Sequence, residues 1–211
     1  MNLSILIIAI LSYLIGSISG GVIVGRIKNV DIRTKGSKAA GATNAFRTMG
    51  ALFALSVLLI DVYKGYFSTL YLPYFFGEEN ILAKSIAGFF SIIGHVFPIF
   101  FKFKGGKGVG TALGTLLAFP QLHLATLIGF LSWLSSLLIT GYVGLGSIIA
   151  GIAVLLFHLL TSNFIFDILT IYILFISIFF VLTHRENIKR LINGTENQFQ
   201  KIMLFNFFKK R

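Results

Sequence analysis

The sequence predicts an all-α, polytopic integral membrane protein of about seven transmembrane helices, with its functional motifs in cytoplasmic loops. Of the 211 residues, 56% are hydrophobic and only 12% are charged, about half the charged share of an ordinary soluble domain. Apolar stretches recur as far as residue 183, so the first of them is not expected to be a cleavable leader on a soluble body. The lysines and arginines gather between these stretches.

The apolar stretches define the expected elements, since one bilayer crossing takes about 20 apolar residues. The fourth stretch is short and glycine-rich, so we expect a tilted, broken or half-inserted helix there, and a count of five or six spans stays open. Residues 1–198 are expected to form one membrane-embedded domain, followed by a basic, aromatic cytoplasmic tail at 199–211. The predicted spans are 3–25, 51–76, 85–101, 109–121, 122–140, 142–160 and 165–183.

The basic residues predict the orientation. Residues 26–50, 102–107 and 185–211 hold 16 of the 18 lysines and arginines. An odd number of spans puts these regions on one side, which the positive-inside rule makes the cytoplasm. The net charge of +11 then has a topological explanation, and no nucleic-acid partner is expected. The absence of cysteine excludes disulfides and thiolate metal sites, and His and carboxylates are too sparse to predict a metal.

Residues 31–47 mix small residues, hydroxyls and cations, and cannot form a core. One interpretation is an exposed loop followed by Thr43 or Asn44 as the N-cap of the next helix. That interpretation does not explain the spacing of Ser37 and Arg47. We therefore favour a functional loop.

A second basic segment, the Lys-Gly loop (residues 102–108), lies between two apolar stretches. Its glycines allow backbone N–H groups to approach a phosphate closely, and its lysines supply charge. It lacks the Ser or Thr that follows Gly-Lys in a Walker A loop. Topology alone would require the lysines but not the glycines, so we predict phosphate binding. The residues concerned are Lys102, Lys104, Lys107, Gly105, Gly106, Gly108 and the following Gly110.

A third polar segment follows the last apolar stretch. If that helix continues, His184, Asn187 and Leu191 share one face, while Glu186 and Arg190 pair four residues apart on another. A polar flank that ends the span would explain the cations but not the His–Asn spacing. His184 and Asn187 are therefore candidate site residues.

Ionisable residues also occur within the predicted spans. Asp61 and Lys64, three residues apart, are expected to form an intramembrane ion pair. We favour a structural pair because its predicted depth is far from the loops. His95, His123 and His158 lie in or beside apolar stretches and are expected to be packing histidines.

Taken together, residues 36–47, 94–108 and 184–197 resemble, in order and spacing, the three motifs of the bacterial acyl-phosphate-dependent glycerol 3-phosphate acyltransferases, the PlsY family. The resemblance covers nearly the full length. It implies transfer of a fatty acyl group from acyl phosphate to the 1-hydroxyl of glycerol 3-phosphate, giving lysophosphatidic acid and phosphate for phospholipid synthesis. It also implies a multi-pass protein of the bacterial inner membrane, with the two substrates and membrane lipid as partners and no cofactor.

The resemblance further implies residue roles. Glu196 would be structural, and Ser37, Arg47, His184 and Asn187 would be catalytic. Substrate binding would fall to Gly36, Thr43, Asn44, Lys104, Gly105, Gly106, Lys107 and Gly108. Three sites depart from the family pattern: Lys38-Ala39 stand where Gly-Asn is usual, Ser19 where Pro is usual, and Gly141 where a cation is frequent.

Acyl phosphate is already activated, so positioning and charge stabilisation suffice. The hydroxyl proton can leave to His184 as base, or to the acyl-phosphate oxygens with His184 and Asn187 only orienting the substrate. We prefer the second route. The His-x-x-x-x-Asp arrangement of other glycerolipid acyltransferases is excluded, because no histidine has an aspartate five residues on. An organic-phosphate transporter and a scaffold for anionic lipids are the alternatives from other classes.

Overall fold

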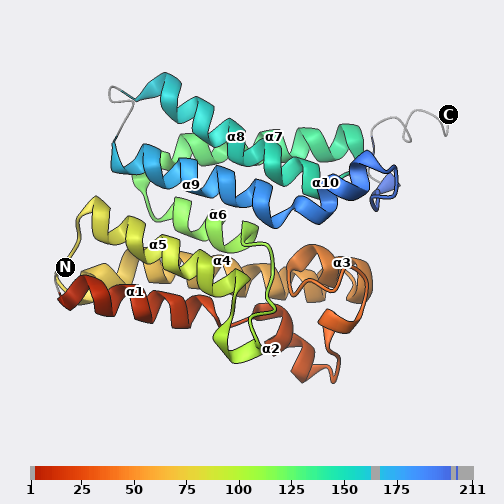
Figure 1. Cartoon of the computed structure of the whole chain (residues 1–211), viewed down its shortest axis with the longest axis horizontal. Helices are drawn as coiled ribbons and strands as arrows, with labels where there is room; N and C mark the ends of the chain where they lie inside the picture. The colour runs from red at the N-terminus through yellow and green to blue at the C-terminus, as the bar shows by residue number, and fades with distance from the viewer. Residues whose placement is uncertain (1–2, 163–166, 201–202, 204–211) are drawn as a thin grey trace. The chain divides into compact units, whose positions relative to one another are not determined.

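The computed structural model describes residues 3–162, 167–200 and 203, and the described part of the chain is helical without strands (Figure 1). It divides into two compact units, residues 1–120 and 121–211. Unit 1 contains α1 (Leu3–Gly16), α2 (Gly20–Ile27), η1 (Ile32–Thr34), α3 (Ala42–Met49), α4 (Ala51–Phe75), α5 (Ile81–Val96), η2 (Ile99–Phe101) and α6 (Val109–Leu117). A short turn, η3 (Pro120–Leu122), leads into unit 2, which contains α7 (His123–Thr140), α8 (Val143–Thr161), α9 (Ile168–Thr183) and α10 (Arg185–Ile192).

The all-α membrane architecture is confirmed, and the expected seven spans are reduced. Five segments are long and apolar enough to cross a bilayer, and α9 with α10 makes a sixth if that bent pair is one span. The difference is α6, whose nine residues extend about 14 Å, half the thickness of the hydrocarbon core. As expected for a half-inserted helix, α6 begins directly after the Lys-Gly loop. The five segments are Leu3–Ile27, Ala51–Phe75, Ile81–Phe101, Pro120–Thr140 and Val143–Thr161.

Glycines set the close helix contacts of unit 1. A Cβ at Gly16 of α1 would overlap the Ser91 carbonyl of α5, and a Cβ at Gly94 would overlap the Tyr13 carbonyl. In lipid, where helices gain little by hiding apolar surface from each other, such close backbone approach is a main source of association. The contact fixes α5, and with it His95 at its C-terminal end.

An interruption separates α1 from α2 inside the first span. The Ser17 hydroxyl donates to the Tyr13 carbonyl, and Ser19 caps α2 by accepting from the Val22 N–H at 3.4 Å. The Ile18 carbonyl, which lies in the interruption, instead accepts from Lys64 Nζ of α4 at 2.6 Å. The chain thereby turns into α2 at a point anchored to α4.

A small hydrophobic core supports the loop that follows α2. It joins η1 and α3 to the first turns of α4 and leaves residues 35–38 at the surface. Its buried members are Ile32, Ala45, Phe53, Ala54 and Val57.

Unit 2 is built on α8, which packs against α7, α9 and α10. The Ser177 hydroxyl of α9 donates to the Gly151 carbonyl of α8 at 2.8 Å, where a Cβ would crowd the Phe180 ring. His158 Nε2 lies 3.1 Å from the Thr170 hydroxyl, which confirms the expected packing role of this histidine. Residues 201–202 and 204–211 of the predicted tail, and residues 165–166 at the start of the last predicted span, lie outside the described residues.

Candidate active site

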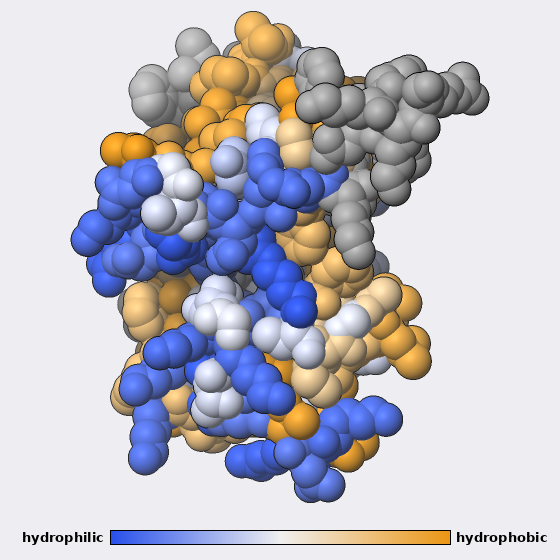
Figure 2. Space-filling view, turned by 90° about the vertical axis from the view of Figure 1, so that its right-hand side faces the viewer, coloured by the Kyte–Doolittle hydropathy of each residue, from blue (hydrophilic) through white to orange (hydrophobic). Residues whose placement is uncertain are grey.

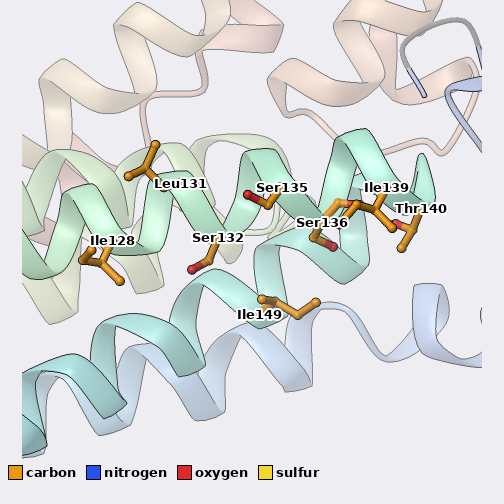
Figure 3. A pocket seen from close by; sticks show the side chains of 8 residues that line it. All are labelled: Ile128, Leu131, Ser132, Ser135, Ser136, Ile139, Thr140 and Ile149. Carbon is orange, nitrogen blue, oxygen red and sulfur yellow. The ribbon is translucent and has the colours of Figure 1, made fainter. Parts of the chain in front are cut away.

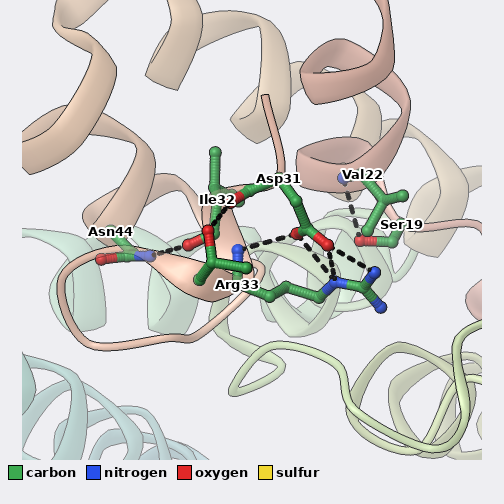
Figure 4. A network of polar contacts seen from close by, with 7 residues as sticks. Ser19, Val22, Asp31, Ile32, Arg33 and Asn44 are labelled. Atoms are coloured by element: carbon green, nitrogen blue, oxygen red, sulfur yellow. Dashed lines mark hydrogen bonds and ion pairs between the residues drawn. The ribbon is translucent and has the colours of Figure 1, made fainter. Parts of the chain in front are cut away.

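The first motif is organised by a buried asparagine. Asn44, 2% exposed, donates from Nδ2 to the carbonyls of Ile32, Lys35 and Ala39 at 2.9–3.0 Å, and its Oδ1 accepts from the Ser37 N–H at 2.9 Å. Figure 4 shows this side chain reaching from α3 to η1. The expected N-cap role of Thr43 or Asn44 is wrong, because Gly41 occupies that position without a side-chain bond. The Asn44 amide instead folds the loop, and a direct contact with substrate stays a prediction.

This loop presents Ser37 at the surface. Its neighbours Gly36 and Lys38 have left-handed φ angles of 55° and 60°, and a Cβ at Gly36 would overlap Asn44 Oδ1. Lys38 thus adopts, at a position where the family pattern has glycine, a conformation that costs a non-glycine residue about 1 kcal/mol. Thr43 and Arg47, four residues apart on α3, share one face of that helix.

Two cations beside this loop contact Phe101, the last residue of η2, directly before the Lys-Gly loop. Arg33 forms an ion pair with Asp31 at 2.8 Å, and its side-chain hydrogen bond lowers the pKa of the Asp31 carboxyl (Figure 4). The guanidinium carbons of Arg33 and Arg26 lie 5.7 and 5.8 Å from the Phe101 ring centre, within cation–π range. Figure 2 shows hydrophilic residues gathered beside apolar ones on the face that it presents. A cavity of about 400 Å³ is lined by Val22, Arg26, Asn29, Val30, Asp31 and Arg33.

The Lys-Gly loop folds back onto the end of α5. The Gly106 N–H donates to the His95 carbonyl at 3.2 Å, and a Cβ at Gly105 would overlap that same carbonyl. Gly108, with φ of 87°, is the N-cap of α6 and supplies no side-chain bond to the first turn. Lys104 is exposed and Lys107 half-buried. Close packing against His95 therefore explains the glycines of this loop independently of ligand binding.

The two motif loops of unit 1 are in direct contact. The Ala40 N–H, three residues after Ser37, donates to the Gly105 carbonyl at 3.4 Å. Ser37, the substrate-binding candidates of the first motif and the Lys-Gly loop are thus assembled on one unit. This is the arrangement expected if they share a ligand.

A buried charged cluster lies beneath the Lys-Gly loop. The expected ion pair is confirmed, with Lys64 Nζ 2.9 Å from Asp61 Oδ1, and both residues are at most 4% exposed. His95 joins the pair, with Nδ1 2.8 Å from Lys64 Nζ. The expectation that this pair lies far from the loops is wrong. The loop is connected to the pair through His95, whose carbonyl accepts from the Gly106 N–H. Gly110 of α6 lies beside Asp61.

The third motif begins at a bend. The chain turns by 53° between α9 and α10, so the expected continuous helix through His184 is wrong. His184 is 2% exposed, and its Nδ1 lies 2.8 Å from the Phe180 carbonyl. Since a carbonyl only accepts, Nδ1 carries a proton, and in the neutral ring the lone pair is on Nε2. The bend at His184 separates it from the helix that carries Asn187.

Asn187 is held by the chain that follows α10. Its Nδ2 donates to Glu196 Oε1 at 2.8 Å, while Arg190 Nε donates to Glu196 Oε2 at 2.6 Å. The expected Glu186–Arg190 pair is wrong, because Arg190 pairs with Glu196 and Glu186 lies 3.9 Å from Arg185. These contacts support the structural role expected for Glu196.

The departing position Gly141 lies at the C-cap of α7. Its φ is 73°, and a Cβ there would crowd Gln198 and Met203. Its carbonyl accepts from the Phe199 N–H at 2.9 Å. A cation at this position would therefore have to displace the chain that follows Glu196.

A second cavity, of about 480 Å³, opens along α7 of unit 2 (Figure 3). Its walls are aliphatic side chains with interspersed hydroxyls and no charged residue, so it suits hydrocarbon better than phosphate. Within the described residues no group of His, Asp and Glu could hold a metal ion. The lining residues are Ile128, Leu131, Ser132, Ser135, Ser136, Ile139, Thr140 and Ile149.

Comparison with known proteins bears on the resemblance of the three motifs. Residues 6–194 match the family model described as Glycerol-3-phosphate acyltransferase. The chain belongs to this family. A Bacillus anthracis member, Glycerol-3-phosphate acyltransferase 2, is 42% identical over 190 residues, which are 90% of this chain and 96% of that protein. The Aquifex aeolicus member is 39% identical over 194 residues, 92% of this chain and 98% of that protein.

Solved structures of family members agree. The crystal structure of PlsY, an integral membrane glycerol 3-phosphate acyltransferase, in its glycerol 3-phosphate form is 37% identical, with a TM-score of 0.84, covering 93% of this chain and 96% of that chain. Its lysophosphatidic acid form gives a TM-score of 0.82 at the same identity, covering 93% and 95%. The PlsY family resemblance is thus confirmed.

The sequence assigned His95 to packing and did not predict its contacts with Asp61, Lys64 and the Lys-Gly loop. A signal was available, because Gly94-His95 directly precedes the Lys-Gly loop and Asp61 and Lys64 required a third partner in an apolar span. What could not be read from the chain is that Gly106 returns to the His95 ring.

Proposed function

We propose that the protein transfers a fatty acyl group from acyl phosphate to the 1-hydroxyl of glycerol 3-phosphate, releasing lysophosphatidic acid and phosphate. The observation that carries the proposal is the hydrogen-bonded contact of the Ser37 loop with the Lys-Gly loop, made by Ala40 and Gly105. Family membership supports the acyltransferase class, and the solved PlsY structures are described as glycerol 3-phosphate and lysophosphatidic acid forms.

The Lys-Gly loop is proposed to hold the phosphate of glycerol 3-phosphate. Glycine N–H groups would donate to phosphate oxygens, while Lys104 and Lys107 add charge. Arg47, on the face of α3 that also carries Thr43, offers a planar donor suited to phosphate. These cations offset the repulsion between two anionic substrates.

The reaction needs no acyl-enzyme. The 1-hydroxyl oxygen bonds to the acyl carbonyl carbon, the bond from that carbon to the phosphate oxygen breaks, and inorganic phosphate leaves. Negative charge develops on the carbonyl oxygen, and the Ser37 hydroxyl is proposed to donate to it. The acyl chain stays among apolar helices.

The hydroxyl proton is proposed to pass to the departing phosphate, with His184 and Asn187 orienting the substrate. His184 acting as a general base is the other route. We prefer the first because Nδ1 of His184 is oriented by the neutral Phe180 carbonyl, whereas a carboxylate would better stabilise the imidazolium that a base becomes. Neither route uses a metal or cofactor.

The site is proposed to face the cytoplasm of a bacterial cell, in the inner membrane. The loops that carry the motifs hold most of the basic residues, which favours that side.

The test is phosphate release from palmitoyl phosphate by the purified full-length protein, with and without glycerol 3-phosphate, and with palmitoyl-CoA as parallel donor. We expect release only with palmitoyl phosphate and glycerol 3-phosphate together. Ser37→Ala should lower turnover about 100-fold, the effect of losing one oxyanion donor. Thr34→Ala, which changes an exposed hydroxyl of the same loop, is the control and should retain activity.

Activity with palmitoyl-CoA alone would refute the proposed donor. No product with either donor would refute the enzyme and leave the transporter, which uptake of radiolabelled glycerol 3-phosphate into proteoliposomes would reveal.

A further inference from the structure

His95 stands between the buried ion pair of α4 and the Lys-Gly loop. One ring nitrogen, Nδ1, faces the pair, at 2.8 Å from Lys64 Nζ and 3.4 Å from Asp61 Oδ1. The other nitrogen, Nε2, faces the loop, because a Cβ added to Gly106 would overlap it. The side chain is 4% exposed.

The partners of Lys64 determine which ring nitrogen carries a proton. Its ammonium group has three N–H donors and no acceptor, and three atoms surround it. They are the Ile18 carbonyl at 2.6 Å, Asp61 Oδ1 at 2.9 Å and His95 Nδ1 at 2.8 Å. Nδ1 therefore accepts, and the ring proton is on Nε2. A doubly protonated ring would carry Nε2–H as well.

The Nε2–H group is aimed at the loop and has no protein acceptor there. Within the described ranges, no residue forms a hydrogen bond with Nε2. The Gly106 N–H is already committed to the His95 carbonyl at 3.2 Å, which fixes the loop over the ring. Nε2 is not among the fully buried polar atoms that lack a partner, so this donor is accessible at the loop, and a ligand bound there can supply its acceptor in place of water.

We propose that His95 donates its Nε2–H to a phosphate oxygen of glycerol 3-phosphate bound at the Lys-Gly loop, with Lys64 as the positioning residue that holds the ring in this tautomer. The inference rests on the proposed function and adds a neutral donor to the lysines. Gly106 then has two tasks, since its missing side chain both admits the loop and leaves Nε2–H accessible to the anion.

The test compares two amide substitutions in the full-length protein. The Gln amide nitrogen in His95→Gln can take the place of Nε2, whereas the shorter Asn amide in His95→Asn can only take that of Nδ1. We expect His95→Asn to raise KM for glycerol 3-phosphate about 10- to 100-fold, the usual effect of losing a hydrogen bond to a charged group. His95→Gln should stay within a few-fold of the parent, and KM for palmitoyl phosphate should change in neither.

Equal KM values of the two variants for glycerol 3-phosphate would overturn the proposal. If both variants also lost thermal stability and turnover to the same extent, His95 would be a packing residue. Inactivity of the unsubstituted protein would instead refute the proposed function. The two failures are therefore distinguishable.

A second measurement does not depend on the stability of His95→Asn. In protein labelled with ¹⁵N-histidine, the His95 signals are identified by their loss in His95→Gln. We expect a protonated Nε2 whose signal shifts when glycerol 3-phosphate is added. An unprotonated Nε2, or one unmoved by saturating glycerol 3-phosphate, would contradict the proposal.

Discussion

The carboxylate of Glu196 holds together the residues of the third motif. Its side chain is 1% exposed, and each oxygen accepts one hydrogen bond, from Asn187 and from Arg190. Arg190 is 33% exposed, so Glu196 is the buried member of the pair, and removing either partner leaves the other without its counter-charge. The orientation of Asn187 therefore depends on a residue nine positions away.

We predict that Glu196→Gln lowers the free energy of unfolding by about 1–3 kcal/mol, because Arg190 loses its counter-charge. The measurement is the apparent unfolding temperature in detergent. Glu186→Gln makes the same chemical change at an exposed carboxylate 3.9 Å from Arg185 and should stay within about 0.5 kcal/mol of the parent. Equal shifts for both variants would contradict the structural role of Glu196.

At single residues, spacing along the sequence did not reveal which atoms a side chain contacts. Asn44 was expected as an N-cap or a substrate ligand, and its partners at Ile32 and Ala39 follow from a loop path that no periodicity encodes. Arg190 was assigned to Glu186 by helical spacing, and Glu196 prevailed because it is buried and the alternative is exposed. Local spacing rules fail where the chain reverses direction.

Among the elements, α6 packs closely on α4 through a glycine. A Cβ at Gly114 would overlap the Val62 carbonyl of α4, whereas a Cβ at Gly110 would make ordinary contacts of 3.4 Å with Asp61 and Leu58. We predict that Gly114→Ala destabilises the protein by about 1–3 kcal/mol through this overlap. Gly110→Ala, its control in the same helix, should be neutral or slightly stabilising, since alanine is the better helix former.

Thermal unfolding of both variants in one detergent checks the pair. An unchanged unfolding temperature for Gly114→Ala would mean that α6 does not pack on α4 as described. A large loss for Gly110→Ala would mean that α6 lies closer to Asp61 than the structure places it.

Element boundaries were predictable where an apolar run ends at a charge or glycine. The expected span 51–76 is α4 at Ala51–Phe75, and 142–160 is α8 at Val143–Thr161. The end of α6 was harder to predict. The predicted span ran to residue 121 because the residues after Leu117 are also apolar, and hydropathy does not show that the helix ends at Leu117. The bend at His184 was missed because an apolar helix followed by a polar one gives no sign of the angle between them.

For the whole molecule, the distribution of charge predicts which side of the membrane each loop occupies. Basic loops are expected in the cytoplasm, whereas the loops expected outside carry Glu78, Glu79, Asp167 and only Lys84. The sequence has no cysteine, so single-cysteine variants report accessibility without background. Three exposed positions serve as probes: Thr34, Asn193 and Glu79.

We predict that Thr34→Cys and Asn193→Cys react with a membrane-impermeant maleimide only in inverted vesicles, and Glu79→Cys only in intact cells. The reverse pattern would refute the proposed orientation. Labelling of Thr34→Cys and Asn193→Cys from opposite sides would refute the expectation that all basic loops share one side. Labelling after detergent treatment is the control for reactivity.

The interruption between α1 and α2 has a consequence for how the protein is made. The Ile18 carbonyl and Asp61 are both in place as partners of Lys64 once α4 has been synthesised, but His95 arrives only with α5. Until then the third N–H of Lys64 has no acceptor from this cluster in a layer without water. We therefore expect α4 to enter the bilayer with the charge of Lys64 balanced by Asp61 but with one Lys64 N–H lacking an acceptor. His95 supplies that acceptor when α5 is made. The order of synthesis therefore predicts an order of assembly, in which the charged cluster beneath the Lys-Gly loop is complete before that loop is made.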